Sequence, residues 1–140
     1  MSVQAVLLPV FALVALVFAV LFGMASRRMV TIKSGVTRLK DIAAGQPKWS
    51  ASASQFGDCY KNQFEIPVLF FALIAIGLPL RKIDLVLVLL SWVFVVTRFA
   101  HAGIFVTSNN IKHRSTAWFA GVIVLLVMWV YFALNMLLII

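Results

Sequence analysis

The chain has 140 residues, of which 64% are hydrophobic and 11% are charged, and its formal net charge at pH 7 is +8. Its mean hydropathy of +1.08 leaves too few polar side chains to cover a water-soluble domain of this size, so the composition excludes a soluble globular protein. The basic residues lie between apolar runs, where membrane orientation accounts for them, and a nucleic-acid partner is therefore not expected.

The first apolar run covers about residues 3–25 without a charged residue, long enough for a helix to cross roughly 30 Å of hydrocarbon. A cleaved signal peptide is the competing interpretation. No basic residue precedes the run, however, and Arg27 and Arg28 follow it. This flanking pattern favours a retained transmembrane helix.

Three further apolar runs follow the first. The second is apolar only over residues 66–80, so we extend its helix backwards through the polar residues before it. The links at 81–82 and 107–114 are short enough for neighbouring helices to pack antiparallel. The sequence therefore predicts a single all-α domain over residues 1–140, an antiparallel four-helix bundle with transmembrane helices at about 3–25, 54–80, 83–106 and 115–140.

The one long connection, about residues 26–53, is strongly basic. Because basic loops stay in the cytoplasm, we expect this loop to be cytoplasmic and, with four crossings, both termini to lie outside. The third link, which carries Lys112 and Arg114, then falls on the cytoplasmic side as well. The only acidic residue of the long connection is Asp41, and its basic residues are Arg27, Arg28, Lys33, Arg38, Lys40 and Lys48.

Two pairs of polar residues fall at similar depth near the cytoplasmic ends of the second and third helices. Asn62 and Glu65 are three residues apart, and so are Arg98 and His101, which places each pair on one helix face. An arginine at the bilayer centre costs roughly 2.5–3.5 kcal/mol, so it needs a partner. We expect Glu65 to pair with Arg98. The network would extend to Asn62, Lys61 and His101.

Two interpretations of this cluster remain open. In the first, Arg98 reaches the interface along its aliphatic stem and Glu65 neutralises it, so the pair only holds helices together. In the second, more cations converge than Glu65 can balance, and an anionic ligand supplies the remaining charge. The converging cations are Lys61, Arg98 and Arg114, with Arg27 and Arg28 nearby.

The remaining conspicuous residues are interpreted as structural. Pro67 lacks an N–H and removes the hydrogen bond to the Gln63 carbonyl, so we expect a bend in the second helix. Cys59 is the single cysteine, which excludes an intrachain disulfide, and no metal site is expected. Trp118 and Trp129 are expected at the membrane interface or in helix packing.

Together these residues resemble the MAPEG family, the membrane-associated proteins of eicosanoid and glutathione metabolism. The resemblance lies in the stretch Asn62-Gln63-Phe64-Glu65-Ile66-Pro67, in Arg98-Phe99-Ala100-His101, and in Arg114 sixteen residues after Arg98. The length, the four spans and the basic loop agree with it, so it covers essentially the whole chain.

Several assignments are implied by the resemblance alone. It implies a homotrimer that binds glutathione, as a co-substrate, between adjacent subunits and that needs no metal. It implies that Arg114 stabilises the glutathione thiolate and, for a bacterial member, a place in the inner membrane. The implied ligand-binding or site-shaping residues are Asn62, Glu65, Arg98 and His101, with basic contributions from Lys61 and from Arg27 or Arg28.

The implied ligand suits the residues chemically. Glutathione has two carboxylates and one ammonium, which complement several arginines and a lysine beside one glutamate. A thiol with a pKa of about 8.5 is mostly protonated at neutral pH, and a nearby guanidinium favours the anion. Arg114 would thus help to form a nucleophile that attacks lipophilic electrophiles or reduces lipid hydroperoxides.

Two residues depart from the pattern of the enzymatic members. Phe105 stands where many of them have tyrosine, which removes a hydroxyl, and Asp58 stands where some have arginine. The family also contains a non-enzymatic lipid-binding protein. We therefore predict a glutathione-dependent membrane transferase or peroxidase, and the alternative is a non-catalytic membrane protein that binds lipid or a partner protein.

Overall fold

The computed structural model describes residues 1–138, which form helices and connecting turns without a strand. Four helical segments, Val3–Lys33, Ala51–Gly77, Leu85–Val106 and Ile111–Leu137, are long and apolar enough to cross a membrane. The predicted all-α bundle is confirmed over the described residues, and the chain is an integral multi-pass membrane protein. The end of the predicted fourth span, residues 139–140, lies outside the described residues. The helices are α1 (Val3–Lys33), α2 (Leu39–Ala43), α3 (Ala51–Asn62), α4 (Pro67–Gly77), α5 (Leu85–Val106) and α6 (Ile111–Leu137).

Short polar side chains cap the N-terminal ends of α1, α3, α5 and α6. Ser2, Ser50 and Asp84 each accept a hydrogen bond from the backbone N–H three residues later, at 3.2, 3.2 and 3.0 Å. The Oδ1 of Asn110 accepts two, from backbone N–H groups in the first turn of α6. These side chains satisfy N–H groups that have no partner within the helix, and they fix where α1, α3, α5 and α6 start.

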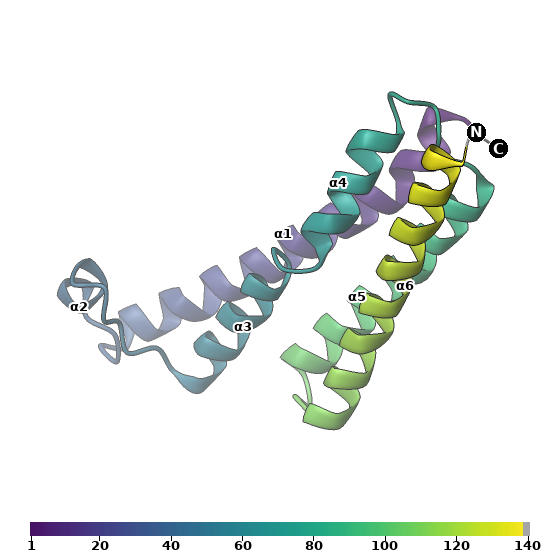
Figure 1. Cartoon of the computed structure of the whole chain (residues 1–140). Coiled ribbons are helices and arrows are strands. Elements are labelled where there is room, and N and C mark those ends of the chain that lie inside the picture. Colours follow the sequence, from purple (N-terminus) through teal and green to yellow (C-terminus); the bar gives the residue numbers. More distant parts are fainter. Residues whose placement is uncertain (139–140) are drawn as a thin grey trace.

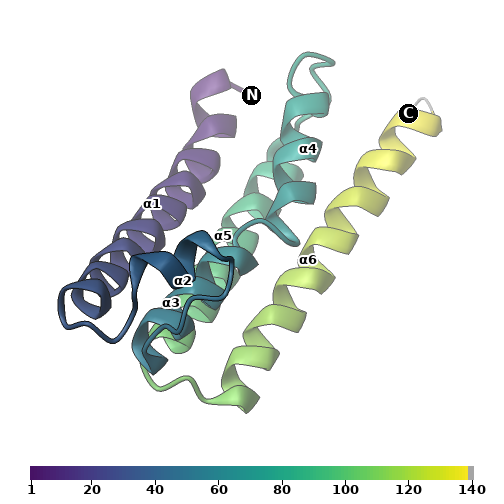
Figure 2. The ribbon, with the colours of Figure 1, turned by 90° about the vertical axis from the view of Figure 1, so that its left-hand side faces the viewer.

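The helices pack around α5. This helix contacts α6, α1 and α3, whereas α4 packs against α6. Both termini lie at one end of the molecule, and α1 and α3 form an arm that carries α2 at the other end (Figures 1 and 2). The link between α5 and α6 lies at the same end of the molecule as α2 (Figure 2).

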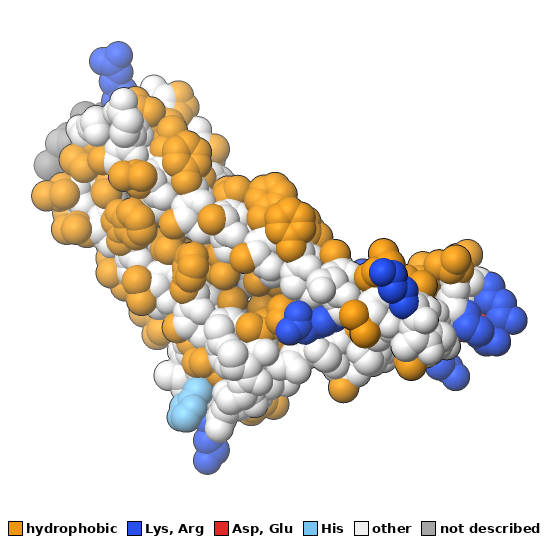
Figure 3. All heavy atoms as spheres, turned by 180° about the vertical axis from the view of Figure 1, so that it is seen from behind, with side chains coloured by type: hydrophobic (Ala, Val, Ile, Leu, Met, Phe, Trp, Pro, Cys, Tyr) orange, Lys and Arg blue, Asp and Glu red, His pale blue; other side chains and the backbone are white. Residues whose placement is uncertain are grey.

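Apolar side chains fill the inside of the bundle and also cover much of its outside. Inside, the rings of Phe70 and Phe94 stack with their centroids 5.1 Å apart, beside the fully buried Leu73, Leu87 and Met128. On one face, apolar side chains spread over the long body, while lysines and arginines lie toward its ends and along the arm (Figure 3). This distribution fits a protein whose surrounding solvent is lipid over most of its length.

The second crossing is not the continuous helix that was expected at 54–80. α3 ends at Asn62 and α4 begins at Pro67, and residues 63–66 between them form turns. Because Pro67 has no N–H, the Gln63 carbonyl cannot accept the usual helical hydrogen bond, and the expected bend is a complete break.

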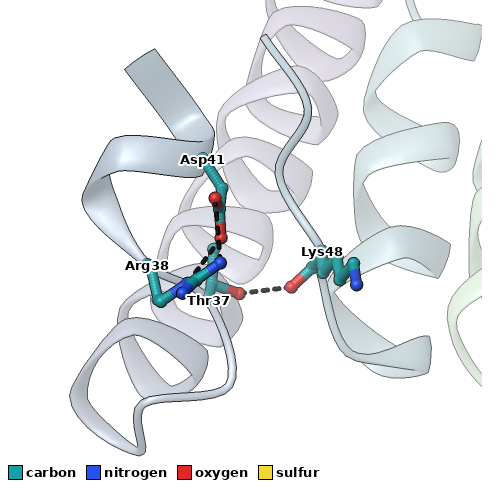
Figure 4. A network of polar contacts seen from close by, with 4 residues as sticks. All are labelled: Thr37, Arg38, Asp41 and Lys48. Carbon is teal, nitrogen blue, oxygen red and sulfur yellow. Dashed lines mark hydrogen bonds and ion pairs between the residues drawn. The ribbon is translucent and has the colours of Figure 1, made fainter. Parts of the chain in front are cut away.

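The basic connection is shorter and more regular than the expected loop at 26–53. α1 continues past the apolar run to Lys33, and α3 begins at Ala51. Within the connection, the Thr37 hydroxyl donates a hydrogen bond to the Lys48 carbonyl at 2.6 Å, and the Arg38 guanidinium pairs with the carboxylate after it in α2 (Figure 4). These contacts close the connection around α2.

Candidate functional site

The break in the second crossing places the end of α3 against α5. Arg98 of α5 is fully buried, and its Nη2 donates a hydrogen bond to the backbone carbonyl of Asn62, the last residue of α3, at 3.2 Å. Carbonyl groups at the C-terminal end of a helix lack helical partners and carry partial negative charge. The guanidinium of Arg98 therefore stabilises the end of α3 through the backbone.

The expected ion pair between Glu65 and Arg98 is absent among the described residues. Glu65 is exposed in the turn after α3 and makes no ion pair. The expectation assumed that Asn62 and Glu65 share one continuous helical face, but the helix ends at Asn62. A backbone carbonyl takes the place of the carboxylate as the partner of Arg98.

His101 lies one turn after Arg98 and is also buried, with 3% of its surface exposed. Its Nδ1 lies 3.1 Å from the backbone carbonyl oxygen of Arg114 in α6. Because a carbonyl oxygen only accepts, Nδ1 carries the hydrogen of this bond. His101 thereby joins α5 to the first turns of α6.

Arg114 is half-buried and is held on two sides. Its guanidinium carbon lies 4.2 Å from the centroid of the Phe105 ring, and its Nη1 donates a hydrogen bond to the side-chain oxygen of Asn109. Asn109 has a φ of 51°, in the left-handed region that asparagine adopts more readily than most residues. Phe105 packs edge-on against the His101 ring, with centroids 5.7 Å apart. These contacts hold the guanidinium in place in the free protein.

A pocket of about 370 Å³ joins His101, Phe105 and Arg114 where α5 ends and α6 begins. Its walls come from α3, α5 and α6, and they combine a guanidinium, a carboxylate and an amide with aromatic rings. Such a site suits a small polar ligand next to an apolar one. Among residues 1–138, no group of three or more His, Cys, Asp or Glu side chains is arranged to hold a metal ion. The lining residues are Asp58, Asn62, His101, Phe105, Arg114, Ser115, Trp118 and Phe119.

Arg27 and Arg28 do not line this pocket but hold α1 against α3 and the segment just before it. The Nε of Arg27 donates a hydrogen bond to the Ser52 hydroxyl at 2.9 Å, and its guanidinium lies 3.6 Å from the centre of the Phe56 ring. The guanidinium of Arg28 lies 4.7 Å from the Trp49 ring. These contacts give the basic end of α1 a surface to pack on, which explains why the helix continues beyond its apolar run.

Three other predicted residues also lie outside the pocket lining. Arg98 lies behind Asn62, and Glu65 lies in the turn after it. Lys61 is exposed, with its Nζ 3.9 Å from the Asp58 carboxylate. The structure therefore brings Asn62, His101 and Arg114 together in the pocket.

Other residues at the site were not expected from the sequence. Trp118, interpreted as a packing side chain, lines the pocket together with Ser115 and Phe119. Helical spacing could have found Trp118, because it lies four positions after Arg114 and therefore one turn later on the same face of α6. The contact of Asn109 with Arg114 depends on a left-handed backbone, for which the sequence carries no comparable signal.

Comparison with known protein families extends over nearly the whole chain. A model of the MAPEG family matches residues 6–134. The match begins in α1 and ends in α6, so it includes every residue that lines the pocket. No curated protein and no solved structure matches the chain.

Proposed function

Because the chain belongs to the MAPEG family of membrane proteins in eicosanoid and glutathione metabolism, we propose that it is a transferase or peroxidase that activates glutathione as a nucleophile. The observation that carries this proposal is that Asn62, His101 and Arg114, from three different helices, line one pocket. Glutathione is the co-substrate, and the reaction needs no metal.

Arg114 is the residue that we propose stabilises the thiolate. A cation beside a thiol favours its anionic form, so more of the bound glutathione is a nucleophile at neutral pH. The guanidinium is already held by Phe105 and Asn109, so little ordering is needed when the ligand binds. The thiol proton passes to solvent.

Two reactions of the thiolate fit the pocket. With an activated aryl halide, a carbon–sulfur bond forms, the carbon–halogen bond breaks and halide leaves. With a lipid hydroperoxide, sulfur attacks the terminal oxygen and the O–O bond breaks, which gives glutathione sulfenic acid and an alkoxide that takes a proton from solvent to form the lipid alcohol. A second glutathione then converts the sulfenic acid to the disulfide and water. Phe105, Trp118 and Phe119 supply an apolar wall for the lipophilic co-substrate.

We also propose that the active form is a homotrimer with glutathione bound between adjacent subunits. Glu65 and Lys61, on either side of Asn62 in sequence, are exposed and do not line the pocket. These two residues are then available to a ligand shared with a second subunit. Arg98 shapes the site through the backbone of Asn62, and Arg27 and Arg28 act by holding α1 to α3.

The proposed orientation places the pocket at the cytoplasmic face. The pocket lies near the α5–α6 link, which is at the same end of the molecule as the basic connection between α1 and α3. Both termini lie at the opposite end (Figure 2). With the basic connection in the cytoplasm, water-soluble glutathione enters from that side and the lipophilic co-substrate enters from the bilayer.

A non-catalytic lipid-binding protein is the second candidate. A separate apolar groove of about 420 Å³ lies between α4 and α6, and it favours this candidate because it suits a hydrocarbon chain. Phe105 supports it as well, since the pocket lacks a tyrosine hydroxyl at that position. The groove is lined by Ile66, Leu69, Val122, Leu125, Leu126 and Trp129.

Glutathione binding to the purified protein, followed by ultraviolet difference spectroscopy for thiolate at pH 7, separates the two candidates. We expect binding, a thiolate signal, and turnover of an activated chloronitrobenzene. Absence of binding at millimolar glutathione would overturn the proposal. Binding without thiolate or turnover would favour the lipid-binding protein.

A further inference from the structure

The pocket carries opposite charges on opposite walls. Asp58 lies on the α3 wall, and Arg114 lies on the α6 wall. The chain has four acidic residues in all, and of these only Asp58 lines the pocket. A ligand that fills the pocket therefore meets one carboxylate as well as one guanidinium.

The Asp58 carboxylate is available to a ligand. Its side chain is 63% exposed, and its contact with Lys61 is a pair of exposed side chains separated by 3.9 Å. Exposed pairs of this kind contribute little, because water and salt screen both charges. A ligand cation in the pocket can replace this contact without breaking a buried ion pair.

Asn62 adds a second acceptor to the same wall. It lies one helical turn after Asp58, and its Nδ2 donates a hydrogen bond to the Asp58 backbone carbonyl at 3.0 Å. This bond uses one of the two amide N–H groups and fixes the orientation of the amide, whose Oδ1 remains available to accept a hydrogen bond. The α3 wall thus offers hydrogen-bond acceptors and negative charge, and the α6 wall offers a donor with positive charge.

From this arrangement we infer that Asp58 binds the ammonium group of the ligand, so that the pocket selects a zwitterionic γ-glutamyl thiol over a thiol with only anionic groups. The inference rests on the proposed function and adds a specificity-determining residue to it. An ammonium that meets a carboxylate and an amide oxygen gains charge-assisted hydrogen bonds, whereas an acetylated amine has no charge to offer Asp58.

The test compares two thiols on the full-length protein in detergent: glutathione, and glutathione acetylated on its γ-glutamyl amine. We expect the wild-type protein to bind glutathione about tenfold more tightly than the acetylated thiol. Asp58→Asn should reduce this preference to within about twofold. Most of the change should be weaker glutathione binding, since the neutral amide no longer attracts the ammonium. The same substitution removes a repulsion of anionic groups, and this smaller effect should strengthen binding of the acetylated thiol.

Two further variants serve as controls. Asp58→Glu keeps the carboxylate and should keep the preference for glutathione. Asp41 lies in α2, outside the pocket, and its carboxylate pairs with Arg38. Asp41→Asn should therefore behave like the wild-type protein. Both variants and Asp58→Asn are checked for unchanged thermal unfolding, because each changes a side chain near the protein surface.

The outcomes separate this inference from the proposed function. If wild-type protein binds glutathione but shows no preference over the acetylated thiol, or if Asp58→Asn keeps the full preference, the inference is overturned and the proposed function stands. If the wild-type protein binds neither thiol, the proposed function is overturned together with the inference.

Discussion

The guanidinium of Arg98 lies at the end of α3, where its Nη2 donates a hydrogen bond to the backbone carbonyl of Asn62 at 3.2 Å. The arginine is fully buried, yet its partner is not an acidic side chain. The cost of placing it in the membrane is offset in part by this carbonyl at the end of α3, whose other backbone contact is a long hydrogen bond of 3.4 Å from the Glu65 N–H.

Arg98→Ala should lower the free energy of unfolding by about 2–4 kcal/mol, because it removes a charge-assisted hydrogen bond and leaves a cavity. Thermal unfolding in detergent measures the change. Arg38→Ala is the matched control, since Arg38 is an exposed arginine whose partner lies in the same short segment. An Arg98→Ala protein as stable as the control would contradict the role of Arg98 at the end of α3.

Glu65→Gln should leave the melting temperature of the protein unchanged. Its carboxylate is exposed and makes no ion pair, so its neutralisation removes no contact within the chain. Glutathione affinity, measured on the same preparation, should fall if Glu65 reaches a ligand shared between subunits. A large loss of stability would instead mean that Glu65 neutralises Arg98 after all.

Arg114→Ala should reduce kcat by about 100-fold and change glutathione affinity much less, because the guanidinium is proposed to stabilise the thiolate. The ultraviolet thiolate signal at pH 7 should be lost in parallel. Lys112→Ala, an exposed cation two residues earlier in the same helix, is the control and should retain both. Equal effects of the two variants would rule out a special role for Arg114.

Phe105→Tyr should raise kcat/KM by about fivefold, the value of one added neutral hydrogen bond at the reacting sulfur. The ring of Phe105 already lines the pocket beneath Arg114, so a hydroxyl on it points to the same region. Phe99→Tyr, on the same helix but away from this pocket, should have no effect on turnover. A Phe105→Tyr protein with unchanged or lower turnover would show that the missing hydroxyl does not limit this chain.

The proposed orientation can be tested by labelling with a maleimide that does not cross membranes. Ser2→Cys, near the N-terminus, should react in intact cells, whereas Ser34→Cys, at the end of α1, should react only after the membrane is opened. Both positions are exposed, and the natural Cys59 is fully buried, so background labelling is low. The reverse pattern would place the basic connection outside.

The four apolar crossings and the effect of Pro67 could be predicted from the sequence, because length, hydropathy and a missing N–H act locally. The continuation of α1 to Lys33 could not. The added turns of α1 place Arg27 and Arg28 against rings that follow much later in the chain.

The site shows the same division between local and distant causes. Asn62, His101 and Arg114 were expected to cluster, since their helices end at the same face of the membrane, and they do line one pocket. The expected pairing of Arg98 with Glu65 is wrong because the three-residue spacing of Asn62 and Glu65 crosses the end of a helix. A side-chain pattern alone does not reveal that a backbone carbonyl has become the better acceptor.

The turn at residues 63–66 also divides one membrane crossing between two packing units. α3 packs on α1 and α5, whereas α4 packs on α6 and, through Phe70, on Phe94 of α5, so the two parts of this crossing share α5 but differ in their other main neighbour. The polar pocket uses residues of α3 before the turn, and the apolar groove uses Ile66 and Leu69 at and after it. Both cavities have α6 as another wall. A single membrane crossing thus contributes to two cavities of opposite polarity, one on each side of its break.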